Sequence, residues 1–137
     1  MASRIEISLA AVLVAAAANM AVGAVWYAPR LLGKRWLAAM GWSQKELARR
    51  KQQGLSKAYG GTFLASLVLA YFLAHVVEFM GASTLLDGAH VGFWVWLGFV
   101  ATTSVGVYLF EGRPLALYLI NAGGYLAGLA VMGALLA

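Results

Sequence analysis

The chain has 137 residues, of which 63% are hydrophobic and 11% are charged, and its formal net charge is +5. Because charged residues make up roughly a quarter of an ordinary soluble domain, this composition excludes that class. The sequence contains no cysteine, which excludes a disulfide, a zinc–thiolate site and a cysteine nucleophile.

Four long apolar runs dominate the sequence, at residues 5–27, 58–80, 85–110 and 114–137. Each exceeds the ~20 residues that a helix needs to cross a ~30 Å hydrocarbon core, and none alternates as a barrel strand would. Helices also satisfy their own backbone hydrogen bonds in lipid. We therefore expect an all-α membrane protein with one domain over residues 1–137, built as a four-helix bundle with a connector at 28–57. The first run is expected to be retained rather than cleaved as a signal peptide.

The connector carries most of the positive charge. Of the ten Lys and Arg residues, Arg4 precedes the first run and Arg113 lies in the turn "EGRP". The other eight lie in the connector: Arg30, Lys34, Arg35, Lys45, Arg49, Arg50, Lys51 and Lys57. Because short loops rich in Lys and Arg remain in the cytoplasm, we expect the connector and the "EGRP" turn to be cytoplasmic. Both termini and the turn "GAST" are then outside.

Two short helices are expected within the connector. The segment "RLLGKRWLAAM" places Leu32, Trp36 and Met40 on one face, which is typical of a helix in the headgroup region of a bilayer. The segment "SQKE" is a capping box that starts a second helix. We expect these residues to meet lipid headgroups: Arg30, Lys34, Arg35, Trp36, Arg49, Arg50 and Lys51. Nucleic acid is not expected as a partner because few stacking or base-reading groups accompany the charges; an unidentified membrane or cytoplasmic protein partner is the open alternative.

Polar residues in all four runs lie at a common depth. These residues are seven or eight positions from the connector-side end of their runs, about 11–12 Å along a helix: Asn19, Ser66, Thr102, Thr103 and Asn121. The simpler interpretation is a layer of interhelical hydrogen bonds, each worth about 0.6–2 kcal/mol. The alternative is that the layer lines a narrow pathway.

A second polar group surrounds the "GAST" turn, in "HVVEFMGASTLLDGAH". An antiparallel hairpin would place Glu78 opposite Asp87 and His75 opposite His90, and such a group could bind a metal ion or a proton. The simpler interpretation is structural, because Thr84 and Asp87 form a capping-box-like helix start. We expect no metal and no other cofactor. His75 and Glu78 are hypotheses for a proton-linked role, because ionisable groups are costly inside a membrane.

The last run is rich in small residues. In "NAGGYLAGLAVMGALLA", Gly124 and Gly128 are four residues apart and Gly133 follows. Small residues at this spacing allow helices to approach closely, either within the chain or between subunits.

Several segments resemble a bacterial family known as domain of unknown function 1761: "WYAPRLLGKRWLAAMGWS", "LAH" at 73–75, "GASTLLDGAHVGFWVWLGFVATT" and "FEGRPLALYLINAGGYLAGLAVMGALL". The residues that match the pattern are Trp26, Tyr27, Pro29, His75, Gly98, Phe99, Thr102, Thr103, Glu111, Arg113, Asn121 and Tyr125. The resemblance implies a small four-helix inner-membrane protein and carries no catalytic role to this chain.

The expected function is therefore that of a non-enzymatic, self-associating membrane protein in the inner (plasma) membrane of a bacterium. The alternative is an oligomeric channel or carrier for a small solute, ion or proton. A membrane-embedded enzyme is less favoured, because no HExxH motif, nucleotide-binding loop or serine triad is present. A carrier requires a cavity that reaches Asn19, Thr102 or Asn121, whereas a scaffold requires these groups to be paired and dry.

Overall fold

The computed structural model describes residues 7–137, and every regular element in that range is helical. Three helices are long, apolar and uninterrupted: α1 (Leu9–Trp26), α4 (Ser56–Phe79) and α7 (Leu115–Leu136). A fourth, spanning Leu85–Glu111, is continuous through α5 (Leu85–Val95), the π-helical segment η1 (Trp96–Ala101) and α6 (Thr102–Glu111). All four are long and apolar enough to cross a membrane, so the predicted all-helical chain with four apolar helices is confirmed. Arg4 and the predicted start of the first helix at residue 5 lie outside the described residues.

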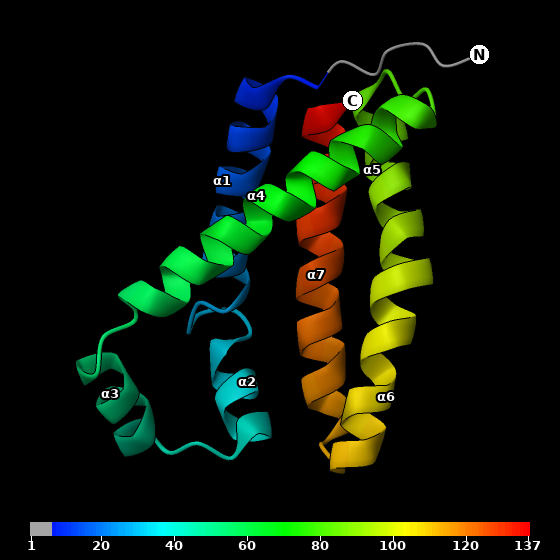
Figure 1. The fold of residues 1–137 in the computed structure, drawn as a ribbon. Helices are drawn as coiled ribbons and strands as arrows, with labels where there is room; N and C mark the ends of the chain where they lie inside the picture. Colours follow the sequence, from blue (N-terminus) through cyan, green and yellow to red (C-terminus); the bar gives the residue numbers. More distant parts are fainter. Residues whose placement is uncertain (1–6) are drawn as a thin grey trace.

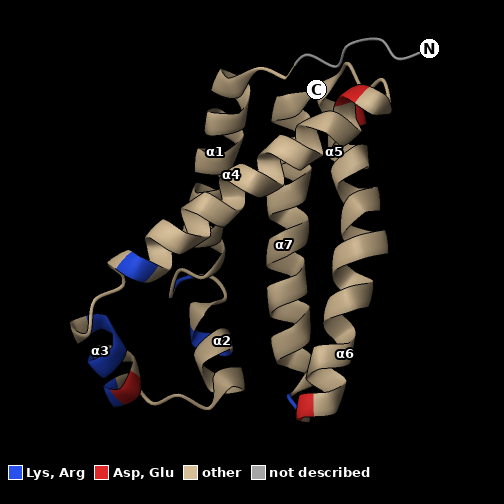
Figure 2. Cartoon of the chain, viewed as in Figure 1, with Lys and Arg blue, Asp and Glu red and all other residues tan. Residues whose placement is uncertain are grey.

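Helix α7 lies at the centre and packs against α5 on one side and α1 on the other. Helix α4 crosses them diagonally, so that its C-terminal end lies near α5 and its N-terminal end lies near α3 (Figure 1). The connector forms α2 (Gly33–Met40) and α3 (Gln44–Gln52). Figure 2 shows that the basic residues of α2, α3 and the start of α4 lie at the same end of the molecule as the α6–α7 turn. The α4–α5 turn and the C-terminus lie at the other end.

The predicted helix caps are present. The Ser43 hydroxyl accepts a hydrogen bond from the backbone N–H of Glu46 at 3.1 Å, and the Thr84 hydroxyl accepts one from Asp87 N–H at 3.0 Å. Each bond satisfies a donor that the first turn of a helix leaves unpaired. After α4, Gly81 adopts a φ of +72°, a left-handed conformation that glycine reaches without steric cost. The capping motifs in the sequence therefore locate the starts of α3 and α5 correctly.

Glycines bring α5 and α7 into backbone contact. A Cβ atom added to Gly88 would collide with the backbone of Gly133, and one added to Gly92 would collide with the backbone of Leu129. On the other side of α7, the space beside Gly128 is filled by the Asn19 side chain. The predicted close approach of small residues is confirmed here as packing within one chain.

The buried core lies towards the α4–α5 turn. It combines small residues of α1, such as Ala15 and Ala16, with Val77 of α4 and with Leu129 and Met132 of α7. No residue at positions 56–65 of α4 is buried. The molecule is therefore tightly packed at one end of α4 and open at the other.

Candidate functional site

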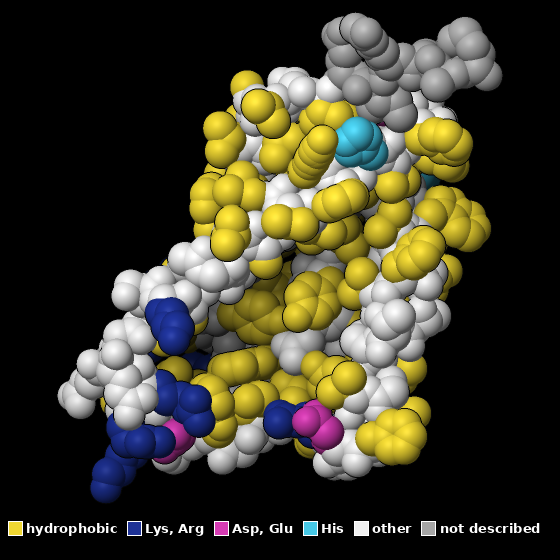
Figure 3. All heavy atoms as spheres, viewed as in Figure 1, with side chains coloured by type: hydrophobic (Ala, Val, Ile, Leu, Met, Phe, Trp, Pro, Cys, Tyr) yellow, Lys and Arg dark blue, Asp and Glu magenta, His cyan; other side chains and the backbone are white. Residues whose placement is uncertain are grey.

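A cavity of about 600 Å³ lies beside the N-terminal part of α4, between this helix and α1, η1 and α7. Figure 3 shows it as a recess with a largely hydrophobic visible wall, with basic side chains near one edge. Because α4 crosses α7 at an angle, the two helices separate towards the connector end. The cavity follows directly from that separation.

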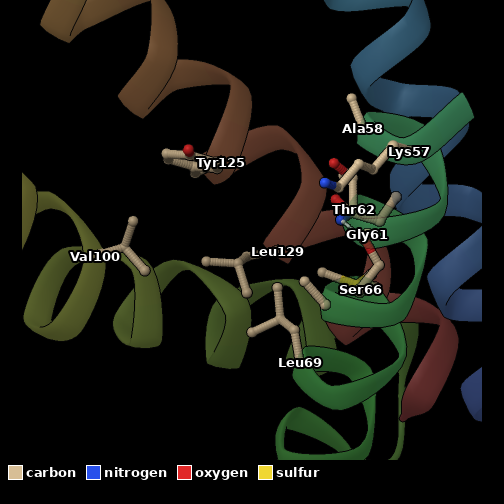
Figure 4. Close-up of a pocket in the computed structure, with 12 residues that line it drawn as sticks. Lys57, Ala58, Gly61, Thr62, Ser66, Leu69, Val100, Tyr125 and Leu129 are labelled. Carbon is tan, nitrogen blue, oxygen red and sulfur yellow. Dashed lines mark hydrogen bonds between the residues drawn. The ribbon is translucent and has the colours of Figure 1, made fainter. Parts of the chain in front are cut away.

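The α4 wall of the cavity changes from polar to apolar along the helix. Lys57, Thr62, Ser66 and Leu69 follow one another on the lining face (Figure 4). Small residues between them at positions 58, 61 and 65 keep the space open, and a Cβ atom added to Gly61 would meet no atom within 4 Å. Sequence reasoning identified Ser66 but missed Lys57 and Thr62 as lining residues. After Lys57, small or hydroxyl residues recur every four positions along α4, and this spacing could have identified the lining face from the sequence.

The opposite wall comes from α7 and η1. It presents Tyr125, Leu129 and Met132 from α7 and Val100 from η1. Tyr125 is 56% exposed, and its hydroxyl makes no hydrogen bond to any of residues 7–137. This wall is therefore apolar except for one phenol group that is accessible to a bound molecule.

Two members of the predicted polar layer meet at the cavity. The Asn19 side-chain nitrogen donates a hydrogen bond to the Ser66 hydroxyl at 2.9 Å, which links α1 to α4. Gly128 makes room for the Asn19 side chain on α7. Asn19 and Ser66 also line the cavity, so these two groups are both paired with each other and reached by the open space.

Asn121 belongs to a separate cluster nearer the connector. Its side-chain oxygen accepts a hydrogen bond from the Tyr27 hydroxyl at 2.7 Å, and its side-chain nitrogen donates to the Tyr108 hydroxyl at 2.7 Å. Interhelical pairing of Asn121 agrees with the simpler interpretation of the polar layer. Its two tyrosine partners were not identified as site residues, because the depth count considered only amides and small hydroxyls.

Further cavities adjoin the first. One of about 520 Å³ extends towards α2 and shares Asn19, Thr62 and Tyr125 with it. Another of about 410 Å³ reaches the α6–α7 turn and is lined by Tyr125, Asn121 and other residues. Tyr125 lines all three cavities, so this side chain lies where they adjoin.

Thr102 and Thr103 make no hydrogen bond to another helix among residues 7–137. Both side chains are exposed, and their hydroxyls donate to the carbonyl oxygens of Gly98 and Phe99 within their own helix. A Thr hydroxyl in a helix can bond the carbonyl four residues earlier, so depth alone does not decide between this local bond and a bond to another helix.

Hydroxyl groups satisfy four successive carbonyls along η1. After those of Gly98 and Phe99, the Val100 carbonyl accepts from Ser104 and the Ala101 carbonyl accepts from Tyr118 of α7 at 2.7 Å. The hydroxyl-rich segment therefore stabilises the π-helical turn instead of a layer between helices.

The outer polar group is not brought together. Among residues 7–137, no three His, Asp or Glu side chains lie close enough to share a metal ion. His75 stacks on Tyr71 with ring centroids 4.8 Å apart, and it is half-buried in an apolar groove. Glu78, Asp87 and His90 are exposed. No hydrogen bond or ion pair joins these four side chains within the described part of the chain, so their proton-linked role stays a hypothesis.

The connector is held by aromatic stacking and by one acidic residue. Trp36 packs edge-on against both Tyr27 and Trp42, at centroid distances of 5.9 and 5.3 Å. Glu46 forms ion pairs with Arg49 and Arg50 at 2.8 and 3.0 Å, and the hydrogen bond from Arg49 lowers the pKa of the Glu46 carboxyl. The remaining basic residues predicted to meet headgroups are exposed: Arg30, Lys34, Arg35 and Lys51.

The fold and the cavity together define the class of the protein. It is an all-helical chain with four helices that have the length and apolarity of membrane spans, as in multi-pass membrane proteins. The chain belongs to the family described as "Protein of unknown function (DUF1761)", whose model matches residues 10–137. The resemblance seen in the sequence is therefore confirmed over almost the whole chain. Neither a curated protein nor a solved structure matches it.

Proposed function

We propose that this protein is a non-enzymatic, membrane-embedded binding protein that holds a small amphipathic molecule between α4 and α7. The observation that carries the proposal is the cavity of about 600 Å³, which is mainly apolar and contains a few convergent polar groups. Binding sites for small molecules typically have volumes of roughly 300–1,000 Å³ and this same composition. We favour the carrier alternative over a purely structural role because the cavity reaches Asn19 and an adjoining cavity reaches Asn121.

The residues around the cavity support binding rather than catalysis. Its polar lining consists of an amide, hydroxyl groups and one lysine, with neither a carboxylate nor a histidine. The Ser66 hydroxyl is hydrogen-bonded to Asn19 rather than to Lys57, so the described residues do not pair this nucleophile with a general base. We place the protein in the inner (plasma) membrane of a bacterium, with the connector in the cytoplasm, because its basic residues share one end of the molecule.

Two neighbouring glycines of α4 allow a matched test. Gly61 lines the cavity and Gly60 does not, and a Cβ atom at either position would meet nothing within 4 Å. Gly61→Leu therefore fills the cavity, whereas Gly60→Leu adds the same group outside it with the same gain in helix propensity. Native mass spectrometry of the protein, mixed with neutral and charged single-chain amphiphiles in turn, would count the molecules bound to each variant.

We expect the wild type and Gly60→Leu to retain one amphiphile per chain, and Gly61→Leu to lose it at an unchanged melting temperature. Equal occupancy in all three proteins, whatever the head group, would contradict the proposed function. A Gly61→Leu variant that melts earlier than Gly60→Leu would be replaced by Ala65→Leu, which fills the same cavity from the next turn.

A further inference from the structure

We propose that the cavity selects an anionic amphiphile, whose carboxylate or phosphate head lies at Lys57 and whose hydrocarbon tail lies along Leu69 and Met132. This inference rests on the proposed function and adds the chemical class of the ligand. It follows from the order in which polar and apolar groups occur around the cavity.

Polarity falls steadily along the α4 wall. Lys57 supplies a positive charge, Thr62 and Ser66 supply hydroxyl groups, and Leu69 is apolar (Figure 4). From Lys57 to Leu69 the wall extends over about 18 Å, at 1.5 Å per residue. A molecule with a charged head and a long apolar tail matches this gradient, whereas a uniformly polar or uniformly apolar molecule matches only part of it.

The opposite wall follows the same order. Tyr125 carries a hydroxyl group that is accessible from the cavity, while Leu129, Met132 and Val100 are apolar. A tyrosine suits the boundary between head and tail, because it combines an apolar ring with a polar tip. The two walls therefore place the polar end of a ligand on the same side.

The charge at this end favours an anion. Lys57 lines the cavity and no Asp or Glu does, so its ammonium group is not neutralised by the lining residues. The nearby connector carries seven further Lys and Arg residues and one acidic residue, Glu46. The positive electrostatic potential of these residues attracts anions and repels cations. Hydrogen bonds between an ammonium group and a carboxylate or phosphate are stronger than those between neutral groups.

The test compares head groups on one tail. Laurate, lauryl alcohol and laurylamine share a chain and differ in charge, and their dissociation constants would be measured by native mass spectrometry in neutral detergent. The variants are Lys57→Gln and Lys57→Glu. The control is Lys45→Gln, which removes an exposed cation of α3 that does not line the cavity.

We expect the wild type and Lys45→Gln to bind laurate about tenfold more tightly than lauryl alcohol, which corresponds to about 1.4 kcal/mol. Lys57→Gln should bind the two equally, and Lys57→Glu should prefer laurylamine. Equal binding of laurate and the alcohol by the wild type, or an unchanged laurate preference in Lys57→Gln, would overturn the inference. The proposed function would survive either result provided that Gly61→Leu still abolished binding of the alcohol.

Competition experiments test the tail and the source of the anionic head. Acetate has the head without the tail and should not compete with laurate. Phosphatidylglycerol should compete more strongly than phosphatidylcholine if the natural source is the bilayer, whereas a free single-chain acid is the source if neither phospholipid competes. Competition by acetate at the concentration of laurate would overturn the role assigned to the tail.

Discussion

The tight contact between α5 and α7 gives the sharpest stability prediction. A Cβ atom added to Gly92 would lie 2.6 Å from the carbonyl carbon of Leu129 and 3.0 Å from the Cα atom of Ala130. Non-bonded carbon atoms attract most strongly at about 3.5–4.0 Å, so the added methyl group is about 1 Å too close. Both obstructing atoms belong to the backbone of α7, which no side-chain rotation can move. Gly92→Ala must therefore push the two helices apart.

The expected cost follows from that displacement. Opening a gap of 0.5–1 Å forfeits roughly a quarter to a half of the attraction at each neighbouring contact. Overpacking a close-packed interior costs about 1–3 kcal/mol, while replacing glycine by alanine within a helix returns about 0.5–1 kcal/mol. We expect Gly92→Ala to lower the free energy of unfolding by about 1–2 kcal/mol.

Gly106 provides the matched control because it lies further along the same long helix and its added Cβ would meet no atom within 4 Å. Gly106→Ala should be neutral or more stable than the wild type, by up to about 1 kcal/mol. Both free energies would be measured by titrating micelles of the protein with a denaturing detergent and following tryptophan fluorescence. Equal stability of Gly92→Ala and Gly106→Ala would show that the backbone contact at Gly92 does not limit the approach of α5 and α7.

Two further predictions concern single hydrogen bonds and ion pairs. Tyr118→Phe removes the hydroxyl that donates to the Ala101 carbonyl at the end of η1. It should lower the free energy of unfolding by about 0.5–1.5 kcal/mol in the same titration. Tyr59→Phe, at an exposed position, should leave the free energy of unfolding unchanged, and equal effects of the two variants would contradict the role of the bond. Because the pKa of Glu46 is lowered in the folded chain, its stabilisation of α3 is complete above the pKa of an unfolded glutamate and is lost as the pH falls through the lowered pKa. Carbon chemical shifts of α3 should therefore lose helical character on acidification, and those of Glu46→Gln should not change.

The sequence was sufficient to predict the four apolar helices and the caps. Hydrophobicity and helix capping are local properties, so Ser43 and Thr84 could be identified from their immediate neighbours. The packing glycines of α7 were also recognisable, because small residues spaced four apart along an apolar helix are typical of close contact between helices. Their partners could not be predicted, since Gly88 and Gly92 lie on α5, far from α7 in the sequence.

The polar layer shows where counting along a helix fails. Depth alone grouped Thr102 and Thr103 with Asn19 and Asn121, but depth does not tell which way a side chain points. A Thr hydroxyl can bond a carbonyl of its own helix, and nothing in the local composition of residues 96–101 predicts the π-helical segment there. Tyr118 completes the hydrogen bonding from another helix, so the segment depends on tertiary packing as well as on its own residues.

The cavity could not be predicted because it arises from the angle of α4. A parallel bundle with the same sequence would bury the face that carries Thr62 and Ser66 against α7. The structure buries only Ser66 of these two. The small residues at 58, 61 and 65 would suit either arrangement, and the crossing angle is set by contacts of the other half of the helix, such as Val77 in the core.

The placement of the glycines also bears on self-association. The small residues that suggested contacts between subunits pack instead against the chain itself: Gly128 against Asn19, and Gly133 against Gly88. Exposed hydrophobic side chains do not mark an interface here, because lipid covers such residues in any membrane-spanning helix. Self-association, expected from the sequence, stays a prediction, and it would have to use another face. Since both walls of the cavity come from one chain, we expect one bound amphiphile per chain whatever the number of subunits. A ratio of one per dimer would place the site between copies instead.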